Sequence, residues 1–312
     1  SKVYPEEHLS VLGTIVNGTS GQKSPANLTV TLHIINEDGE VKVFNANTDS
    51  DGGFKFADLP NGSTYSISVN YHNIAYSKLL EVPLIKKPVT LKVFEPAHSL
   101  EAITINDHIL FIRDIDVNNQ KISFLEIVGL TNQRDRVFIP SVEDPSKMNF
   151  LRFSLPTGFN DLDVSSSLES GQIINVGTGF GITSPVLPGI QQITYTYNIP
   201  YENPKLPLSY TFHQGVDSFQ IVGPLDISIA KSSNPLDHTT TSIEDQSFSI
   251  WGTDSLAAGQ TVTLELHNLP QPSLWSRVTK ELLGGSYLAI WTPILLSAFL
   301  ITIIIYSLNP NV

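Results

Sequence analysis

One run of residues near the C-terminus limits most strongly what this chain can fold into. The 22 residues from Tyr287 to Leu308 carry no formal charge. As an α-helix they would span about 33 Å, slightly more than the ~30 Å hydrocarbon core of a bilayer. A helix buried in a globular core rarely needs so long a run without a polar face. The sequence therefore predicts one transmembrane helix over 286–308, followed by a short tail over 309–312.

Aromatic side chains mark both ends of the predicted span. Tyr287 and Trp291 lie near its start and Tyr306 lies near its end. Amphipathic aromatic rings favour the level of the lipid headgroups, so we expect these three side chains to anchor the helix in the membrane.

An amphipathic segment precedes the span. Leu274, Val278 and Leu282 recur at four-residue spacing, with charged residues on the other faces. This pattern is typical of a short helix that lies in the membrane interface. Gly284 and Gly285 would then break the helix, so we predict a juxtamembrane helix and glycine hinge over 271–285.

The orientation of the span follows less directly. Arg277 and Lys280 precede it and nothing basic follows Leu308, so the basic residues alone would place the folded part in the cytoplasm. Long folded domains, however, translocate largely regardless of charge. The start at Ser1 is compatible with removal of a signal peptide, although loss of an initiator Met would look the same. Because the chain also lacks cysteine and reads as β-rich, we expect extracytoplasmic domains, periplasmic or at the cell surface.

Composition excludes several classes of function. Hydrophobic residues make up 41% of the chain, charged residues 15%, and cysteine is absent. A disulfide scaffold, thiol catalysis, a cysteine-ligated metal site and a disordered chain are therefore excluded. The net charge of −12 makes nucleic acid a poor partner, because phosphate binding depends on Lys and Arg.

The rest of the chain reads as β-structure. Between Leu9 and Leu269 no segment has helical periodicity, and β-branched and aromatic runs recur every 8 to 12 residues between turn residues, as in β-sandwiches. In a first domain, 1–95, we predict seven strands: Leu9–Val16, Leu28–Ile35, Val41–Asn47, Phe54–Ala57, Thr64–Tyr71, Ala75–Leu80 and Val89–Phe94.

The segment from Thr48 to Val69 carries a recognisable pattern, TDSDGGFKFADLPNGSTYSISV. It resembles the repeat motif of carboxypeptidase regulatory-like domains, also called transthyretin-like or CnaB-like folds. The matching positions are Thr48, Asp49, Asp51, Gly52, Phe54, Phe56, Leu59, Pro60, Gly62 and Tyr65. The resemblance covers about residues 9 to 95 and implies an immunoglobulin-like or transthyretin-like sandwich used as a stalk, spacer or docking module.

Turn residues punctuate this motif. The residues from Asp49 to Gly53 predict a tight turn that contains Gly52 and Gly53, and we expect Gly52 to have a positive φ. Pro60 and Gly62 predict a second turn. Asp49 and Asp51, with Asp58 nearby, also resemble the start of a calcium loop. That loop lacks its bidentate Glu, because Pro60 stands at the required position, so we interpret the aspartates as turn residues.

A second β-sandwich domain is predicted over 96–270. Its expected strands are Ile109–Ile115, Ile122–Leu130, Arg136–Ile139, Phe150–Leu155, Gln191–Ile199, Leu208–Phe212, Phe219–Val222, Leu225–Ala230, Ser247–Trp251 and Thr261–Leu266. This region is vaguely similar to extracytoplasmic β domains of unassigned role in bacterial membrane proteins. With 8 basic and 19 acidic residues it carries a charge of −11. We expect an acidic surface that includes Asp114, Asp116, Asp161 and Asp163 to dock on a basic partner.

No motif indicates a reaction or a cofactor. The eight histidines lack metal-ligand spacing, and the chain has no nucleophile elbow. Gly177, Gly179 and Gly181 lack a P-loop lysine and read as a mobile loop or bulge.

The predicted fold class is therefore all-β: two successive β-sandwiches followed by one transmembrane helix. The predicted function is that of a non-enzymatic accessory or structural subunit that binds integral membrane subunits and membrane lipid. A free-standing surface protein that binds glycan or another cell, and a hydrolase whose site forms only in the fold, stay as alternatives.

Overall fold

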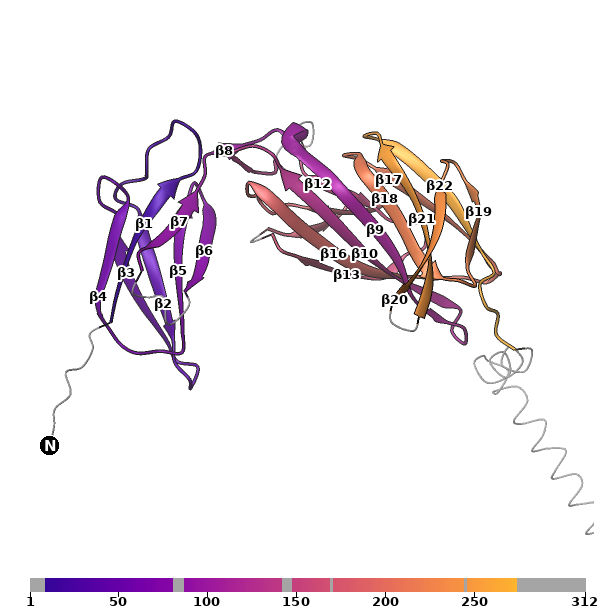
Figure 1. Cartoon of the computed structure of the whole chain (residues 1–312), viewed down its shortest axis with the longest axis horizontal. Coiled ribbons are helices and arrows are strands. Elements are labelled where there is room, and N and C mark those ends of the chain that lie inside the picture. The colour runs from indigo at the N-terminus through magenta and orange to yellow at the C-terminus, as the bar shows by residue number, and fades with distance from the viewer. Residues whose placement is uncertain (1–8, 81–86, 142–147, 169–170, 244–245, 274–312) are drawn as a thin grey trace, which may run out of the picture.

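The fold is all-β, as the sequence predicts. The computed structural model describes residues 9–80, 87–141, 148–168, 171–243 and 246–273. These residues form strands and one short 3-10 helix, Leu100–Ala102 (Figure 1). No helix among them is long and apolar enough to cross a membrane. The predicted span over 286–308, with Tyr287, Trp291 and Tyr306, lies outside the described residues, as does the predicted juxtamembrane segment from residue 274 onward.

Seven strands in two sheets form the N-terminal unit. They are β1 (Leu9–Asn17), β2 (Thr29–Ile35), β3 (Val41–Asn47), β4 (Gly53–Leu59), β5 (Thr64–Tyr71), β6 (Ile74–Leu80) and β7 (Val89–Val93). One sheet has the order β4-β1-β7 and the other has the order β3-β2-β5-β6. Alternate residues such as Val30, Leu32 and Ile34 of β2 are fully buried between the sheets, which is the period-2 pattern expected of a sandwich strand.

A larger unit follows. Its strands are β8 (Pro96–Ala97), β9 (Ile103–Asp116), β10 (Lys121–Asn132), β11 (Val137–Phe138), β12 (Leu151–Ser154), β13 (Asn160–Ser166), β14 (Ile173–Asn175), β15 (Gly179–Ile182), β16 (Gly189–Pro200), β17 (Lys205–Phe212), β18 (Val216–Pro224), β19 (Ser228–Ser232), β20 (Asp237–Ile243), β21 (Gln246–Leu256) and β22 (Gln260–His267). One sheet has seven strands in the order β13-β16-β10-β9-β18-β21-β20. Two three-stranded sheets, β12-β15-β14 and β17-β22-β19, contribute to the same core.

Five strands of this unit were not predicted from the sequence. They are β8, β13, β14, β15 and β20. The expectation of a mobile glycine-rich loop is wrong for Gly179 and Gly181, which belong to β15, a strand buried along its whole length. A Cβ at Gly179 would lie 2.0 Å from the carbonyl oxygen of Phe153 in the paired strand, so the glycines permit close approach of two backbones. The strand predicted at Leu225 begins only at Ser228, after an exposed turn.

The two units share residues at their junction. Strands β8 and β11 pair in parallel, Pro96 with Val137 and Ala97 with Phe138. Val137 is fully buried, and it lies in the hydrophobic core of the first unit although it follows the long β10 strand of the second. The Thr19 hydroxyl donates to the carbonyl of Asp135 at 2.7 Å. The connection is therefore a packed contact, and it lies at one end of the large sheet (Figure 1).

Candidate docking face and buried polar cluster

Strand β10 separates two environments in the second unit. Its inward residues, such as Phe124 and Val128, are fully buried in the core. Its outward residues, Leu125 and Ile127, are half-buried and belong to neither hydrophobic core. Because side chains alternate across a strand, the outward face of the seven-stranded sheet carries apolar side chains that the internal core does not use.

The register of the sheet joins these side chains into a row. Leu125 pairs with Phe111 of β9, Phe111 with Val222 of β18, and Val222 with Ile250 of β21. Ile127 pairs with Ile109 in the row beside it. We call the side chains of Ile109, Phe111, Leu125, Ile127, Val222 and Ile250 the apolar strip; Val222 is buried at 8% exposure and the other five are half-buried. None of them is part of the core cluster of this unit or packed against it.

Acidic residues border the apolar strip at one edge. Asp114 pairs with Ser123, whose hydroxyl donates to Asn198 at 2.5 Å, and the Asn198 amide donates to Asp161 at 2.8 Å. Asp163 pairs with Thr196 of β16. The β-sheet thus brings Asp114, Asp161 and Asp163 to one face, although nearly fifty residues separate the first from the last in the sequence.

Asp116 occupies a different setting from the other three docking candidates. It ends β9, and its carboxylate accepts hydrogen bonds from the side-chain amide of Asn119 at 2.7 Å and from the backbone N–H of the same residue at 3.0 Å. These hydrogen bonds, the side-chain one first, hold the pKa of Asp116 below its ordinary value. Asp116 therefore also stabilises the β9–β10 turn.

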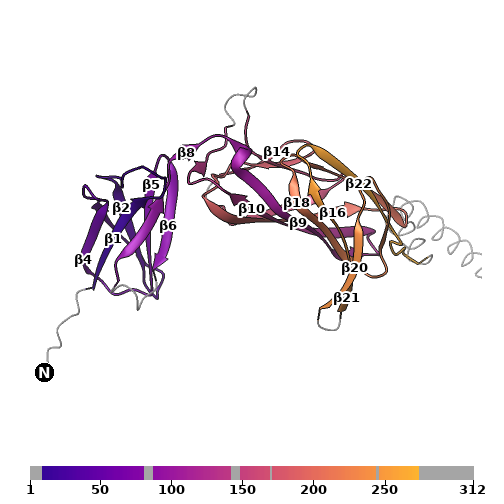
Figure 2. The ribbon, with the colours of Figure 1, turned by 45° about the horizontal axis from the view of Figure 1, so that its top comes forward.

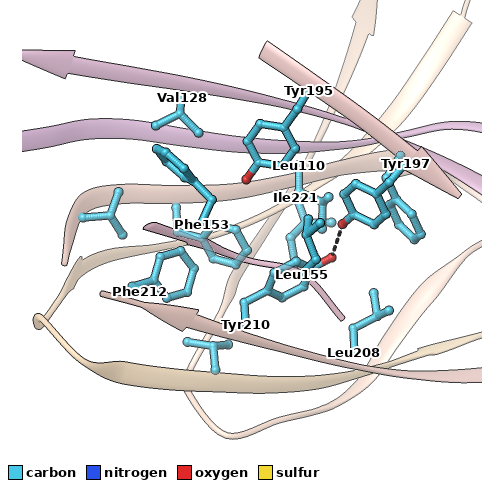
Figure 3. Packing of buried hydrophobic residues seen from close by; sticks show 14 of the residues in the cluster. Leu110, Val128, Phe153, Leu155, Tyr195, Tyr197, Leu208, Tyr210, Phe212 and Ile221 are labelled. Atoms are coloured by element: carbon cyan, nitrogen blue, oxygen red, sulfur yellow. Dashed lines mark hydrogen bonds between the residues drawn. The ribbon is translucent and has the colours of Figure 1, made fainter. Parts of the chain in front are cut away.

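A buried polar cluster lies on the other side of the same sheet. The Glu126 carboxylate is fully buried and accepts hydrogen bonds from the hydroxyls of Tyr195 and Tyr197, each at 2.6 Å. His108 of β9 bonds to the same carboxylate. The Tyr197 and Tyr210 hydroxyls are 2.8 Å apart, and Tyr210 belongs to β17 in the facing sheet (Figure 3).

The hydrogen bonds of this cluster stabilise the packing of the two sheets, and we call the cluster a structural tie for that reason. Burial, and then the charge of Glu126, raise the pKa values of Tyr195, Tyr197 and Tyr210 well above the ordinary value. All three hydroxyls therefore stay protonated and available as donors. The cavity beside His108 has a volume of about 20 Å³, enough for about one water molecule. The cluster links the two facing sheets of the sandwich through the contact between Tyr197 and Tyr210.

Sequence reasoning missed this cluster, although β10 carries a signal for it. Glu126 stands in phase with Ile122, Phe124, Val128 and Leu130, which are all inward and fully buried. A carboxylate in the middle of an apolar inward series must find partners within the core, because burial of an unpaired charge is very costly. Periodicity can therefore place Glu126 inside, but only the tertiary structure supplies His108 and the tyrosines.

The predicted turn residues of the first unit lie together between β3 and β4. The Asp49 carboxylate accepts hydrogen bonds from the backbone N–H of Asp51 at 2.9 Å and of Gly53 at 2.7 Å. Gly52 has a φ of +82°. Among the described residues, no group of three or more His, Asp and Glu side chains could hold a metal ion.

The second predicted turn lies between β4 and β5. The backbone N–H of Gly62 donates to the Tyr65 hydroxyl at 2.7 Å, and that hydroxyl donates to the carbonyl of Pro60 at 3.3 Å. Tyr65 is almost fully buried, so its ring fills the core while its hydroxyl fastens the turn.

Comparison with known proteins gives no family for this chain. No family model matches it, and no curated protein matches it. The M1 zinc metallopeptidase from Deinococcus radiodurans is similar over 53% of this chain and 42% of its own, at 10% identity and a TM-score of 0.31. A putative nutrient binding protein from Legionella pneumophila is similar over 53% of this chain and 67% of its own, at 11% identity and a TM-score of 0.34. Likenesses this weak assign no activity.

Proposed function

We propose that this protein is a non-enzymatic, membrane-anchored, extracytoplasmic subunit of a larger membrane complex, and that it docks on its partner through the apolar strip. The observation that carries the proposal is the row Leu125–Phe111–Val222–Ile250, which crosses four neighbouring strands on the outward face of the large sheet. Leu125, Phe111 and Ile250 are partly exposed, and contiguous apolar side chains that reach the surface mark interaction sites. The 22-residue apolar run at the C-terminus supports the anchor.

The charge of the surroundings indicates the chemistry of the partner. Asp114, Asp161 and Asp163 border the strip, in a domain whose net charge is −11. An interface with an apolar centre and a charged rim gains speed and specificity when the partner carries the opposite charge. The partner should therefore present an apolar patch with Lys or Arg at one side.

The two alternative functions, a hydrolase and a free-standing glycan-binding protein, require different features. A hydrolase would need reactive groups that a substrate can reach, whereas the buried cluster around Glu126 adjoins a cavity of only about 20 Å³. A free-standing glycan-binding protein would be isolated without integral membrane subunits. Mass spectrometry of a native detergent extract therefore separates the subunit proposal from the glycan-binding one.

The experiment compares three forms of the full chain, purified in mild detergent from the membranes of its own organism. The wild type should carry integral membrane subunits at fixed stoichiometry. The double variant Phe111→Thr, Leu125→Thr removes the centre of the strip, and threonine is also a good strand former. This variant should therefore lose the integral membrane subunits. Ile190→Thr is the control, because it alters a side chain on β16 that is 83% exposed and lies outside the strip. This variant should keep the membrane subunits. Partners retained by the double variant, with an unchanged melt, would overturn docking through the strip.

A second arm tests the acidic rim. Exposed charges are screened over about 8 Å at physiological ionic strength, so raising salt to about 0.5 M should weaken docking steered by the rim. Changing Asp114, Asp161 and Asp163 to Asn should weaken docking in the same way without lowering the melting temperature, and Asp116 is kept because its carboxylate stabilises the β9–β10 turn. Association that is indifferent to both changes would assign the acidity to solubility and the assembly to the membrane helix.

A further inference from the structure

The last described residues leave the second unit at a fixed place. The Tyr201 hydroxyl donates to the carbonyl of Pro270 at 2.8 Å, and the backbone N–H of Leu269 donates to the carbonyl of Pro204 at 3.1 Å. Both contacts hold Leu269 and Pro270 against the β16–β17 turn. The segment that continues toward the predicted span therefore starts from this end of the sandwich.

Two more turns share this end. Lys121 pairs with Pro200 and with Asp116, so the β9–β10 turn lies beside the end of β16. His267 pairs with Lys205 and with Ser228, so the β18–β19 turn lies beside the start of β17. The first unit joins the sandwich at the opposite end, near the start of β9 (Figure 2). We call the end with the three turns the exit end.

An exposed leucine projects from the exit end. Leu225, in the β18–β19 turn, is 52% exposed, whereas Ile227 two residues later is 2% exposed. A single exposed leucine is common on protein surfaces and needs no explanation by itself. The position of Leu225 is what matters here, because it lies at the end from which the chain leaves toward an apolar anchor.

The sequence beyond Ser273 indicates what the exit end faces. Leu274, Val278 and Leu282 begin the amphipathic pattern only four residues after Pro270, the residue that Tyr201 holds. If that segment lies in the membrane interface, as its pattern predicts, the exit end must stand close above it. We propose that the exit end rests on the surface of a phospholipid bilayer with Leu225 at headgroup depth; this inference rests on the membrane anchor proposed above.

Charge at the exit end indicates how this contact works. Lys121 and Lys205 lie there with three acidic residues, Asp116, Glu202 and Asp226, so the end has no excess of basic charge. Attraction to anionic lipid requires an excess of basic residues. The contact therefore depends on the anchor and on the apolar tip, and it should be as strong on neutral phosphatidylcholine as on bilayers that contain anionic lipid.

The chain provides a matched internal control. Ile190 is also exposed, at 83%, but it pairs with Thr131 at the far end of β16, ten residues before Pro200. At about 3.3 Å per residue this places it about 33 Å from the exit end. The headgroup layer is only about 5 to 8 Å thick on each side of the bilayer. A group at residue 190 should therefore not reach it.

The absence of cysteine allows each site to be labelled alone. The single-cysteine variants Leu225→Cys and Ile190→Cys of the full chain would each carry an environment-sensitive fluorophore and be reconstituted in phosphatidylcholine nanodiscs that contain a headgroup-labelled quencher lipid. We expect most of the emission to be lost at residue 225 and to be unchanged at residue 190, at low and high salt. Flotation of the unlabelled chain with liposomes tests the anchor separately.

The outcomes distinguish the two proposals. A chain that floats with liposomes but shows no quenching at residue 225 would overturn contact of the exit end and leave the anchor standing. A chain that does not float would overturn the anchor, and with it this inference. Equal quenching at both positions would mean that the sandwich lies along the membrane, which also contradicts the proposed contact.

Discussion

The Tyr195 hydroxyl donates a 2.6 Å hydrogen bond to the carboxylate of Glu126 inside the core of the second unit. Both residues belong to the seven-stranded sheet, on neighbouring strands β16 and β10. Tyr197, two residues further along β16, donates to the other carboxylate oxygen and also contacts Tyr210 of the facing sheet. One buried carboxylate thus fixes two strands of one sheet and, through Tyr197, the spacing between the sheets.

Replacement of Glu126 should therefore strongly lower the free energy of unfolding of the second unit. Glu126→Ala leaves His108 and the hydroxyls of Tyr195 and Tyr197 without the acceptor that they share, and each buried polar group left without a partner costs about 1 to 3 kcal/mol. Urea denaturation of the second unit measures the loss. Glu101→Ala is the matched control, because the Glu101 side chain is 84% exposed, and it should change stability by less than about 0.5 kcal/mol. Equal effects of the two substitutions would show that the cluster is not a structural tie.

The two faces of β10 show how far sequence reasoning can go. Alternation predicts that Phe124 and Val128 face one side and Leu125 and Ile127 the other, and burial confirms this division. Alternation could not predict that Phe111 lies next to Val222, because that contact requires parallel pairing of β9 with β18 across more than a hundred residues. The strip is a product of this long-range pairing, and no local propensity encodes it.

The junction between the units gives a second prediction. Val137 lies within the hydrophobic core of the first unit, so Val137→Ala should leave a cavity there. Loss of two buried methyl groups, together with the cavity, should cost about 1.5 to 3 kcal/mol. The loss should appear in the unfolding transition of the first unit. Val43→Ala, at a side chain 54% exposed on β3, should have almost no effect. A loss confined to the second unit would contradict the packing of Val137.

Gly52 supports a third prediction, with Gly39 as its control. Both have a φ of +82°, but a Cβ at Gly52 would lie 2.2 Å from the carbonyl oxygen of Ile15, whereas one at Gly39 would meet nothing within 4 Å. Gly39→Val therefore reports the cost of the backbone conformation alone, about 1 to 3 kcal/mol. Gly52→Val should lower the melting temperature further, because the β1 strand must also shift. A smaller loss at Gly52 than at Gly39 would exclude the close approach.

Other parts of the second unit lay beyond local sequence signals for physical reasons. β14 and β15 are three and four residues long, and the glycines of β15 are ordinarily read as loop residues. β20 consists mainly of hydroxyl-bearing and charged residues and forms the edge of the large sheet, so it lacks the apolar alternation by which strands are recognised. Their strand conformation depends on pairing partners that the sequence does not name.

The dependence of stability on pH gives the last prediction, at the Tyr71–Glu95 hydrogen bond beside the junction. The Tyr71 hydroxyl donates to Glu95 at 2.7 Å and is the main reason why the pKa of Glu95 lies below its ordinary value of 4.5. Its contribution to stability is therefore present above pH 4.5 and is lost as pH falls through the lowered pKa. Burial, and then Glu95, raise the pKa of Tyr71 from 10.0 to about 12, so that contribution is present below pH 10 and is lost as pH rises toward 12. Tyr71→Phe should reduce the alkaline loss, part of which remains because burial also raises the pKa of Tyr76, and it should weaken the acid loss. The melting temperature of the first unit, followed from pH 3 to 12, measures both, and parallel curves for variant and wild type would contradict the assignment.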